Sequence, residues 1–139
     1  MPVLHFHLVE DQYSQAQCET LMTDSSKLYA EVLDCPIERV RVFINLYRPT
    51  MVAVAGITVA KGGTAAPYFE FLALAGRPLE QRQRLLTGFT DLLERILGVE
   101  KSLIRGGCWT IPAEDWCIGG AVANDLRAQE ISARLDAPD

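Results

Sequence analysis

The residue of this chain with the clearest chemical potential is Pro2, which follows the initiator methionine. Initiator methionine is commonly removed before a small residue, so we expect the mature protein to begin at Pro2. Its nitrogen would then be a secondary amine, and a free α-amino group titrates near ~7.7–8.0. Burial and a neighbouring cation would both lower this pKa and favour the neutral base. Pro2 is therefore a candidate general base, unless Met1 is retained and the nitrogen is an amide.

The other reactive residues give little indication of a metal site or a cofactor. His5 and His7 share one face of an alternating segment, but no third ligand lies near them in the sequence. The four cysteines show no CxxC spacing: Cys18, Cys35, Cys108 and Cys117. We therefore expect no metal site, and cysteines that are reduced, mostly buried and cytosolic. No GxGxxG loop opens a helix, so we expect no nucleotide cofactor.

Composition limits the class of protein. The chain has 139 residues, 49% of them hydrophobic and 22% charged, which indicates one domain, or two small fused units, with a real core. The net charge of -5 argues against nucleic acid, although a few converging arginines can still bind an anion. No apolar run approaches a membrane span, and no signal peptide is visible. We expect a cytoplasmic protein.

The first half of the chain predicts a strand, a helix, a second strand and a short hairpin. Residues 3–9 alternate in polarity, which indicates a strand with a buried face. Ser14 is a plausible N-cap for a helix over residues 15–33, which Pro36 then stops. A second strand follows over residues 40–46, and the apolar residues 51–59 favour a hairpin or an extended arm.

The second half repeats this order after a small, glycine-rich linker at residues 61–66. We predict a strand over 67–74, a helix over 79–97, a strand over 102–109, a small hairpin and a closing helix over 124–135. Pro78 suits the start of the long helix and Gly98 its end.

The repeat is regular enough to predict the fold. Arg41 and Arg105 each open a strand 64 residues apart, and Pro2 and Pro67 are 65 residues apart. Two β-α-β units, at residues 1–60 and 67–139, would form one α+β, two-layer domain. Its four-stranded sheet would carry both helices on one face. The other face is expected to be apolar and buried between subunits.

Several motifs resemble those of a known family. The first half carries the amino-terminal proline and PIERVRVFI, and the second carries GRPLEQRQ, SLIRGG and EDWCIGGAVANDLRA. Over nearly its whole length the chain resembles the 4-oxalocrotonate tautomerase group of the tautomerase superfamily, in the form where two short subunits are fused. The resemblance implies the tautomerase fold, which macrophage migration inhibitory factor shares, and a homotrimer.

The resemblance also implies roles for individual residues. Pro2 matches the family's general base. Arg77 and Arg105 match catalytic arginines that bind the carboxylate and carbonyl oxygens of a substrate. Arg41 matches the same arginine position as Arg105, but in the first half of the chain. Trp116 matches the aromatic residue that forms one wall of the pocket. Tyr47, Trp109 and Glu114 are weaker candidates for the lining.

Three departures indicate that the two halves have specialised. Gln12 stands where the first half would have a counterpart of Arg77, and a residue near Val52 stands opposite Trp116. Pro67 lies inside the chain, so its nitrogen is an amide and cannot act as a base. We expect one competent site per chain, built from both halves.

The resemblance implies a cofactor-independent tautomerase that acts on an enol or dienol of a 2-keto carboxylate. Decarboxylases and hydratase–dehalogenases of the same superfamily are the alternative, but they need a carboxylate beside the proline. The positions that align with theirs hold Ser26, Arg39 and Ile118, and Glu114 is a loose substitute. A non-catalytic trimeric binding protein on the same scaffold is a further alternative, which the loss at Gln12 keeps open.

Overall fold

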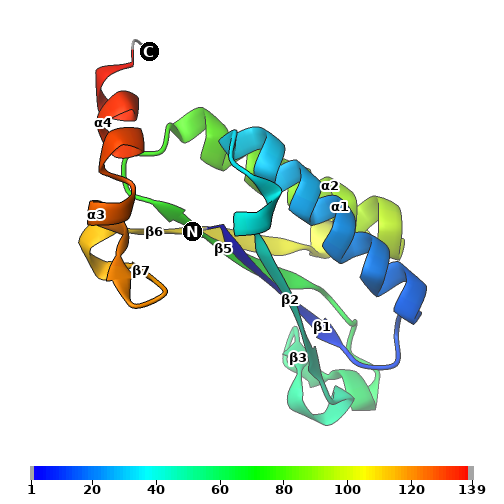
Figure 1. The fold of residues 1–139 in the computed structure, drawn as a ribbon. Helices are drawn as coiled ribbons and strands as arrows, with labels where there is room; N and C mark the ends of the chain where they lie inside the picture. Colours follow the sequence, from blue (N-terminus) through cyan, green and yellow to red (C-terminus); the bar gives the residue numbers. More distant parts are fainter. Residues whose placement is uncertain (1, 138–139) are drawn as a thin grey trace.

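A computed structural model describes residues 2–137 of the chain, and it contains one central four-stranded sheet (Figure 1). The strands are β1 (Val3–Val9), β2 (Arg41–Tyr47), β5 (Tyr68–Leu74) and β6 (Arg105–Ile111), in the order β2-β1-β5-β6. β1 is parallel to β2 and β5 is parallel to β6, whereas the central pair, β1 and β5, is antiparallel. The two β-α-β units therefore lie side by side in opposite directions.

Both long helices cover one face of this sheet, as predicted: α1 (Gln15–Leu33) and α2 (Leu79–Leu97) (Figure 1). Ser14 caps α1 with a capping box. The Ser14 hydroxyl accepts from the Gln17 N–H at 3.1 Å, and the Gln17 side chain accepts from the Ser14 N–H at 2.9 Å. Gly98 ends α2 in the left-handed conformation, because it has no Cβ to oppose it.

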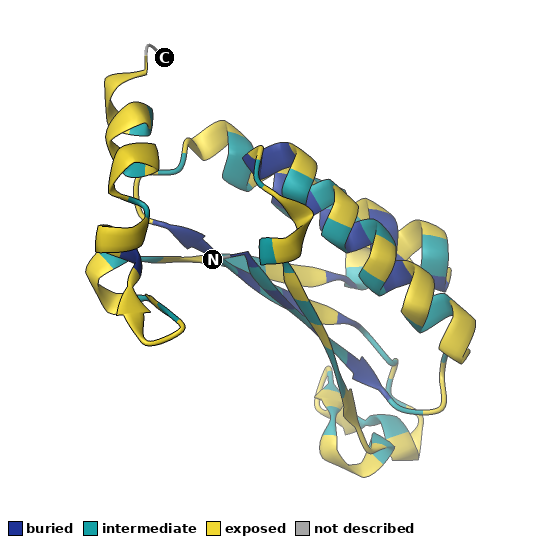
Figure 2. Ribbon diagram, viewed as in Figure 1, coloured by how far each residue is buried: buried dark blue, intermediate teal, exposed yellow. Residues whose placement is uncertain are grey.

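The core lies between the sheet and the helices, where the buried residues gather in Figure 2. Its centre is aromatic. Phe89 of α2 packs edge-on against Phe6, Phe69, Phe71 and Tyr29, at ring-centroid distances of 5.2–6.4 Å. Such edge-to-face pairs add to the free energy gained by removing large rings from water. This packing fixes β1 and β5 in register at the middle of the sheet.

A short hairpin follows each unit, as predicted. The first pairs β3 (Ala53–Val54) with β4 (Ile57–Thr58), and the second pairs β7 (Cys117–Ile118) with β8 (Ala121–Val122). Gly56 and Gly120 take positive φ angles of 80° and 86° at equivalent turn positions. Five single-turn 3-10 helices lie in the connections between the other described elements: η1 (Ile37–Arg39), η2 (Pro49–Met51), η3 (Val59–Lys61), η4 (Lys101–Leu103) and η5 (Ala113–Asp115).

Two elements of the second half differ from the sequence prediction by more than one residue. The last strand begins at Arg105, not at residue 102, because η4 occupies the preceding residues. The single closing helix is wrong: α3 (Ala123–Leu126) ends at Arg127, whose φ of -117° and ψ of 18° are not helical. α4 (Ala128–Asp136) then starts in a new direction, away from the sheet (Figure 1).

The cysteines are free, as expected, but they are less buried than predicted. Cys18, Cys35 and Cys108 are half-buried, and Cys117 is exposed because it lies on the small hairpin. Within residues 2–137, no helix combines the length and apolar character of a membrane span. The same residues hold no group of three potential metal-ligating side chains.

Candidate functional site

Pro2 is buried at one end of the sheet, directly before β1. Its carbonyl accepts a hydrogen bond from the Arg41 N–H at 2.9 Å, which fixes it beside the start of β2. It lines a cavity of about 20 Å³, which has room for about one water molecule. The charged residues of the lining are Arg39, Arg77, Arg127, Glu130 and Arg134. The described part of the chain thus surrounds Pro2 with four cations and one carboxylate.

Arg77 reaches this cavity from the turn between β5 and α2. One guanidinium nitrogen donates to the Leu33 carbonyl at 2.8 Å and lies 3.5 Å from the side-chain oxygen of Gln81. Burial lowers the pKa of Arg77, and the nearby Arg134 guanidinium lowers it further. Because Arg77 has no ion-pair partner among the described residues, a carboxylate in the cavity would compensate its buried charge.

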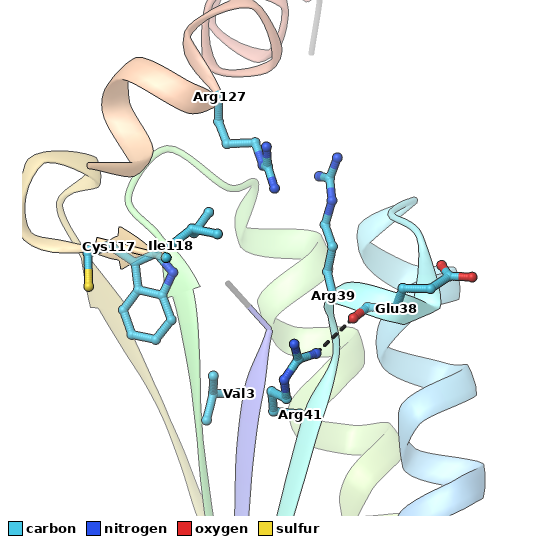
Figure 3. A pocket seen from close by; sticks show the side chains of 9 residues that line it. Val3, Glu38, Arg39, Arg41, Cys117, Ile118 and Arg127 are labelled. Atoms are coloured by element: carbon cyan, nitrogen blue, oxygen red, sulfur yellow. Dashed lines mark hydrogen bonds between the residues drawn. The ribbon is translucent and has the colours of Figure 1, made fainter. Parts of the chain in front are cut away.

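A larger cavity of about 410 Å³ lies next to the first (Figure 3). The two share Arg39, Ile118 and Arg127, which form the wall between them. Figure 3 shows Arg39 and Arg127 extending toward one another. The larger cavity has a volume typical of small-molecule sites. Its lining also includes Arg41 and Trp116, so the structure brings both predicted binding residues to the Pro2 end.

Arg41 and Trp116 differ in how fully their polar groups are satisfied. Arg41 donates to two backbone carbonyls, those of Glu38 at 2.7 Å and Val40 at 3.2 Å. The indole Nε1 of Trp116 is buried and has no hydrogen-bond partner in the described part of the molecule. A buried, unsatisfied N–H is unfavourable, so an oxygen of a bound ligand would stabilise it.

Arg105 lies at the other end of the sheet. Its N–H donates to the Pro67 carbonyl at 3.3 Å, and its guanidinium donates to the carbonyls of Ser102 and Ile104. Because β1 and β5 are antiparallel, Pro2 and Pro67 are at opposite ends. One chain therefore assembles Pro2, Arg77, Arg41 and Trp116 but not Arg105. A role for Arg105 beside Pro2 requires a neighbouring chain, and it stays a prediction.

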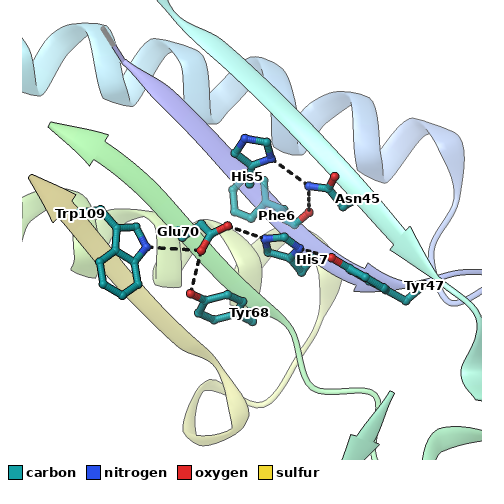
Figure 4. Close-up of polar contacts among 8 residues, drawn as sticks. All are labelled: His5, Phe6, His7, Asn45, Tyr47, Tyr68, Glu70 and Trp109. Atoms are coloured by element: carbon teal, nitrogen blue, oxygen red, sulfur yellow. Dashed lines mark hydrogen bonds and ion pairs between the residues drawn. The ribbon is translucent and has the colours of Figure 1, made fainter. Parts of the chain in front are cut away.

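The sheet face opposite the helices carries Tyr47 and Trp109, two of the weaker candidates, and it is not the apolar face that we expected. Glu70 lies near its centre (Figure 4). Its carboxylate interacts with His7 Nε2 at 3.1 Å and accepts hydrogen bonds from the hydroxyl of Tyr68 at 2.9 Å and Trp109 Nε1 at 3.3 Å. Tyr47 continues the network, 2.6 Å from His7 Nδ1. Alternating polarity along a strand shows in the sequence which residues face outward. It does not show which residues of neighbouring strands they bind.

Electrostatics within this network favour the charged carboxylate. Partial burial raises the pKa of Glu70, but the hydrogen bonds from Tyr68, His7 and Trp109 outweigh it and lower the pKa overall. Tyr47 and Trp109 are thus members of this network and do not line the Pro2 cavities. Glu114, on η5, is exposed and lies outside those cavities as well.

Sequence reasoning missed three charged residues that the structure places at Pro2: Arg127, Glu130 and Arg134. Glu130 forms a two-pronged ion pair with Arg39, with N–O distances of 3.0 and 3.1 Å. Hydrogen bonding to Arg39 lowers the pKa of Glu130, and Arg127 and Arg134 reinforce this. The spacing of these three residues, three and then four apart, is the helical spacing that aligns side chains on one face. That signal was present in the sequence.

Comparison with solved structures places this arrangement in a known group. A native fused 4-OT matches with a TM-score of 0.83 and 25% sequence identity, over 89% of this chain and 98% of the other. A fused 4-OT described as an asymmetric trimer matches with a TM-score of 0.80 and 21% identity, over 89% and 98%. A malonate semialdehyde decarboxylase, described with decarboxylase and hydratase activities, matches at 0.69 and 18%, over 91% and 98%.

Neither a protein-family model nor a curated protein matches the sequence. The structural matches nevertheless cover most of the chain, with TM-scores up to 0.83. The resemblance predicted from the motifs is therefore confirmed at the level of the fold. The chain has the fold of the fused 4-OT proteins of the tautomerase superfamily.

Proposed function

We propose that this protein is a cofactor-independent tautomerase that converts the enol or dienol form of a 2-keto carboxylate, with Pro2 as general base. The observation that carries the proposal is the burial of Pro2 among four arginines. A nearby cation disfavours the protonated amine, so Pro2 would be neutral near neutral pH once Met1 is removed. The same cations would attract an anionic substrate.

The residues then divide the reaction between them. Arg77 would hold the substrate carboxylate through its planar guanidinium. Pro2 would take the proton from the enol hydroxyl and return it to a carbon of the same molecule. Negative charge that develops on the oxygen would be stabilised by Arg41, or by Arg105 of a neighbouring chain. Trp116 would form the wall of the site and donate its free indole N–H to a substrate oxygen.

A homotrimer is part of this proposal. The fused 4-OT relative described as a trimer supports it. The open sheet face supports it too, because Trp109 and Phe43 are 56% and 49% exposed there, beside Tyr47 and Tyr68. Aromatic side chains that are exposed on one face of a monomer are typical of surfaces that bind another protein. Assembly through this face would also supply Arg105 from a second chain.

One observation favours a second candidate function, a decarboxylase or hydratase. Glu130 lines the same cavity as Pro2, whereas the residues that match the carboxylate positions of those enzymes, Ser26, Arg39 and Ile118, are not acidic. A carboxylate in that place could activate water or direct loss of carbon dioxide. Its ion pair with Arg39, however, engages both of its oxygens. Tautomerisation therefore remains the first proposal.

The first experiment is intact mass spectrometry, to show whether Met1 is removed. Ultraviolet-monitored tautomerisation of 2-hydroxymuconate and phenylenolpyruvate then compares the wild type with Pro2→Ala. Turnover that the substitution abolishes would support Pro2 as the base. Release of carbon dioxide would favour the decarboxylase, whereas tautomerisation leaves the substrate mass unchanged. A protein that lacks Met1 and turns over no enol would favour the trimeric binding protein.

A further inference from the structure

The helix α4 begins at the Pro2 end of the sheet and makes little apolar packing. None of its residues is buried, Leu135 is 73% exposed, and Figure 2 shows it as exposed over most of its length. A cavity of about 450 Å³ separates α4 from the end of α1 and the turn before α2. Elements with few buried contacts open at low free energy. The attachment of α4 therefore depends largely on its polar contacts.

Glu130 provides the strongest of these contacts. Both of its carboxylate oxygens bind the guanidinium of Arg39, which lies on η1 in the other half of the chain. Arg127 adds a longer contact to Glu130 at 4.0 Å. A planar guanidinium that binds two carboxylate oxygens has the geometry that an arginine uses for a carboxylate substrate. Glu130 thus occupies the guanidinium of Arg39, which lines the same cavity as Arg77, the arginine expected to hold a substrate carboxylate.

The space beside Pro2 is consistent with this interpretation. Its volume of about 20 Å³ has room for a water molecule but not for a 2-keto acid. The larger cavity of about 410 Å³ is separated from Pro2 by Arg39, Ile118 and Arg127. Two of these three side chains contact Glu130. Release of Glu130 would therefore free the wall that keeps a ligand away from Pro2.

We propose that Glu130 is an internal competitor for the substrate carboxylate, and that α4 is a lid that leaves Pro2 when an anion takes Arg39. The proposal rests on the proposed function in that it takes the substrate to be a carboxylate. Glu130 then lowers the affinity for the substrate. Only an anion that can displace it from Arg39 would bind beside Pro2. It takes no part in the proton transfer.

Kinetics with Glu130→Gln separate this role from a catalytic one. The substitution keeps the size of the side chain and removes its charge. Exposed ion pairs are weak, so we expect KM for 2-hydroxymuconate to fall about two- to fivefold while kcat is kept. The matched control is Glu80→Gln, which removes an exposed ion pair with Arg84 on α2 and should leave both constants unchanged. A hundredfold loss of kcat at constant KM would overturn the proposal and make Glu130 a reacting carboxylate.

Hydrogen–deuterium exchange tests the lid without any turnover, with fumarate as a non-reacting dicarboxylate. In the wild type, amides of α4 should exchange faster as fumarate is added. In Glu130→Gln they should exchange fast from the start and respond little, while α1 stays protected as proof of folding. Unchanged or slower exchange of wild-type α4 with fumarate would overturn the proposal. If no enol is turned over, the proposed function fails, but this exchange result still decides the role of α4.

Discussion

The two ends of the sheet have nearly the same backbone and very different side chains. At one end the Pro2 carbonyl accepts from the Arg41 N–H, and at the other the Pro67 carbonyl accepts from the Arg105 N–H. Each of these arginines also donates to the carbonyls one and three residues before it. Local geometry was therefore conserved between the halves while the surroundings of each proline changed.

The surroundings come largely from the opposite half of the repeat. The hairpin of the second half places Trp116 and Ile118 at the Pro2 end, and η2 and the hairpin of the first half place Met51 and Val52 at the other. The cavity at the Pro67 end, about 410 Å³, is lined by aromatic and apolar residues together with His7 and Glu70, and its lining contains no arginine. In a fused chain, substitutions can thus change the side chains at one proline without changing those at the other. In separate identical subunits, the same substitution would change every site.

The sharpest test of this difference is the paired substitution of the two prolines. Pro2→Ala should lower kcat/KM about 10²–10⁴-fold, the usual contribution of a general base. Pro67→Ala should change it less than about twofold, because the Pro67 nitrogen is an amide whether or not the ring is present. Steady-state kinetics on the same enol measures both. Equal losses in the two variants would contradict the division of labour between the halves.

Arg77 and Gln12 offer a second paired test. Charge-assisted hydrogen bonds contribute about 1.5–3 kcal/mol, so Arg77→Gln should lower kcat/KM about tenfold to hundredfold. The reverse exchange, Gln12→Arg, adds a cation in the exposed turn after β1 but supplies no base. Activity of the double variant Pro2→Ala/Gln12→Arg should therefore stay at the level of Pro2→Ala. A rise above that level would show that the Pro67 end can still react.

The halves also differ in how they fill the core. At equivalent positions of the sheet, Leu4 pairs with Val42, whereas Phe69 pairs with Gly106. A Cβ on Gly106 would lie 2.1 Å from the Phe69 ring, so Gly106→Ala should destabilise the fold by about 1–3 kcal/mol. Urea unfolding would measure this loss. Gly107→Ala is the matched control, because its Cβ would meet no atom within 4 Å and should change stability far less.

The repeat was sufficient to predict the sheet, the helices on one face and the caps at Ser14 and Gly98, because these depend on local pattern and chemistry. The location of Arg105 was not predictable in the same way. Arg41 and Arg105 are equivalent in the repeat, and only the antiparallel pairing of β1 with β5 sends them to opposite ends. The break at Arg127 gave no signal either, since neither glycine nor proline marks it. The Arg127 side chain lines both cavities at the Pro2 end, and a local contact to Glu130, three residues on, accompanies the change of direction.

Glu70 provides the last and smallest test, at the centre of the open sheet face. Its folded-state pKa lies below the ordinary glutamate value near ~4.3, so the unfolded chain binds more protons as pH falls. The stability that Glu70 contributes is therefore complete above that value and is lost as pH drops through the lowered pKa. Thermal unfolding should show Glu70→Gln with a lower Tm than the wild type at pH 7.

The gap between the two Tm values should close as the pH drops through the lowered pKa of Glu70, because the wild-type carboxyl group is then protonated as well. Glu114→Gln, at an exposed position outside the network, should show no such gap. A gap that stays constant with pH would mean that Glu70 acts through the shape of its hydrogen bonds rather than its charge. In that case His7, Tyr68 and Trp109 would hold the carboxyl group, charged or neutral, better than they hold the amide, and the polar centre of this face would be a packing feature.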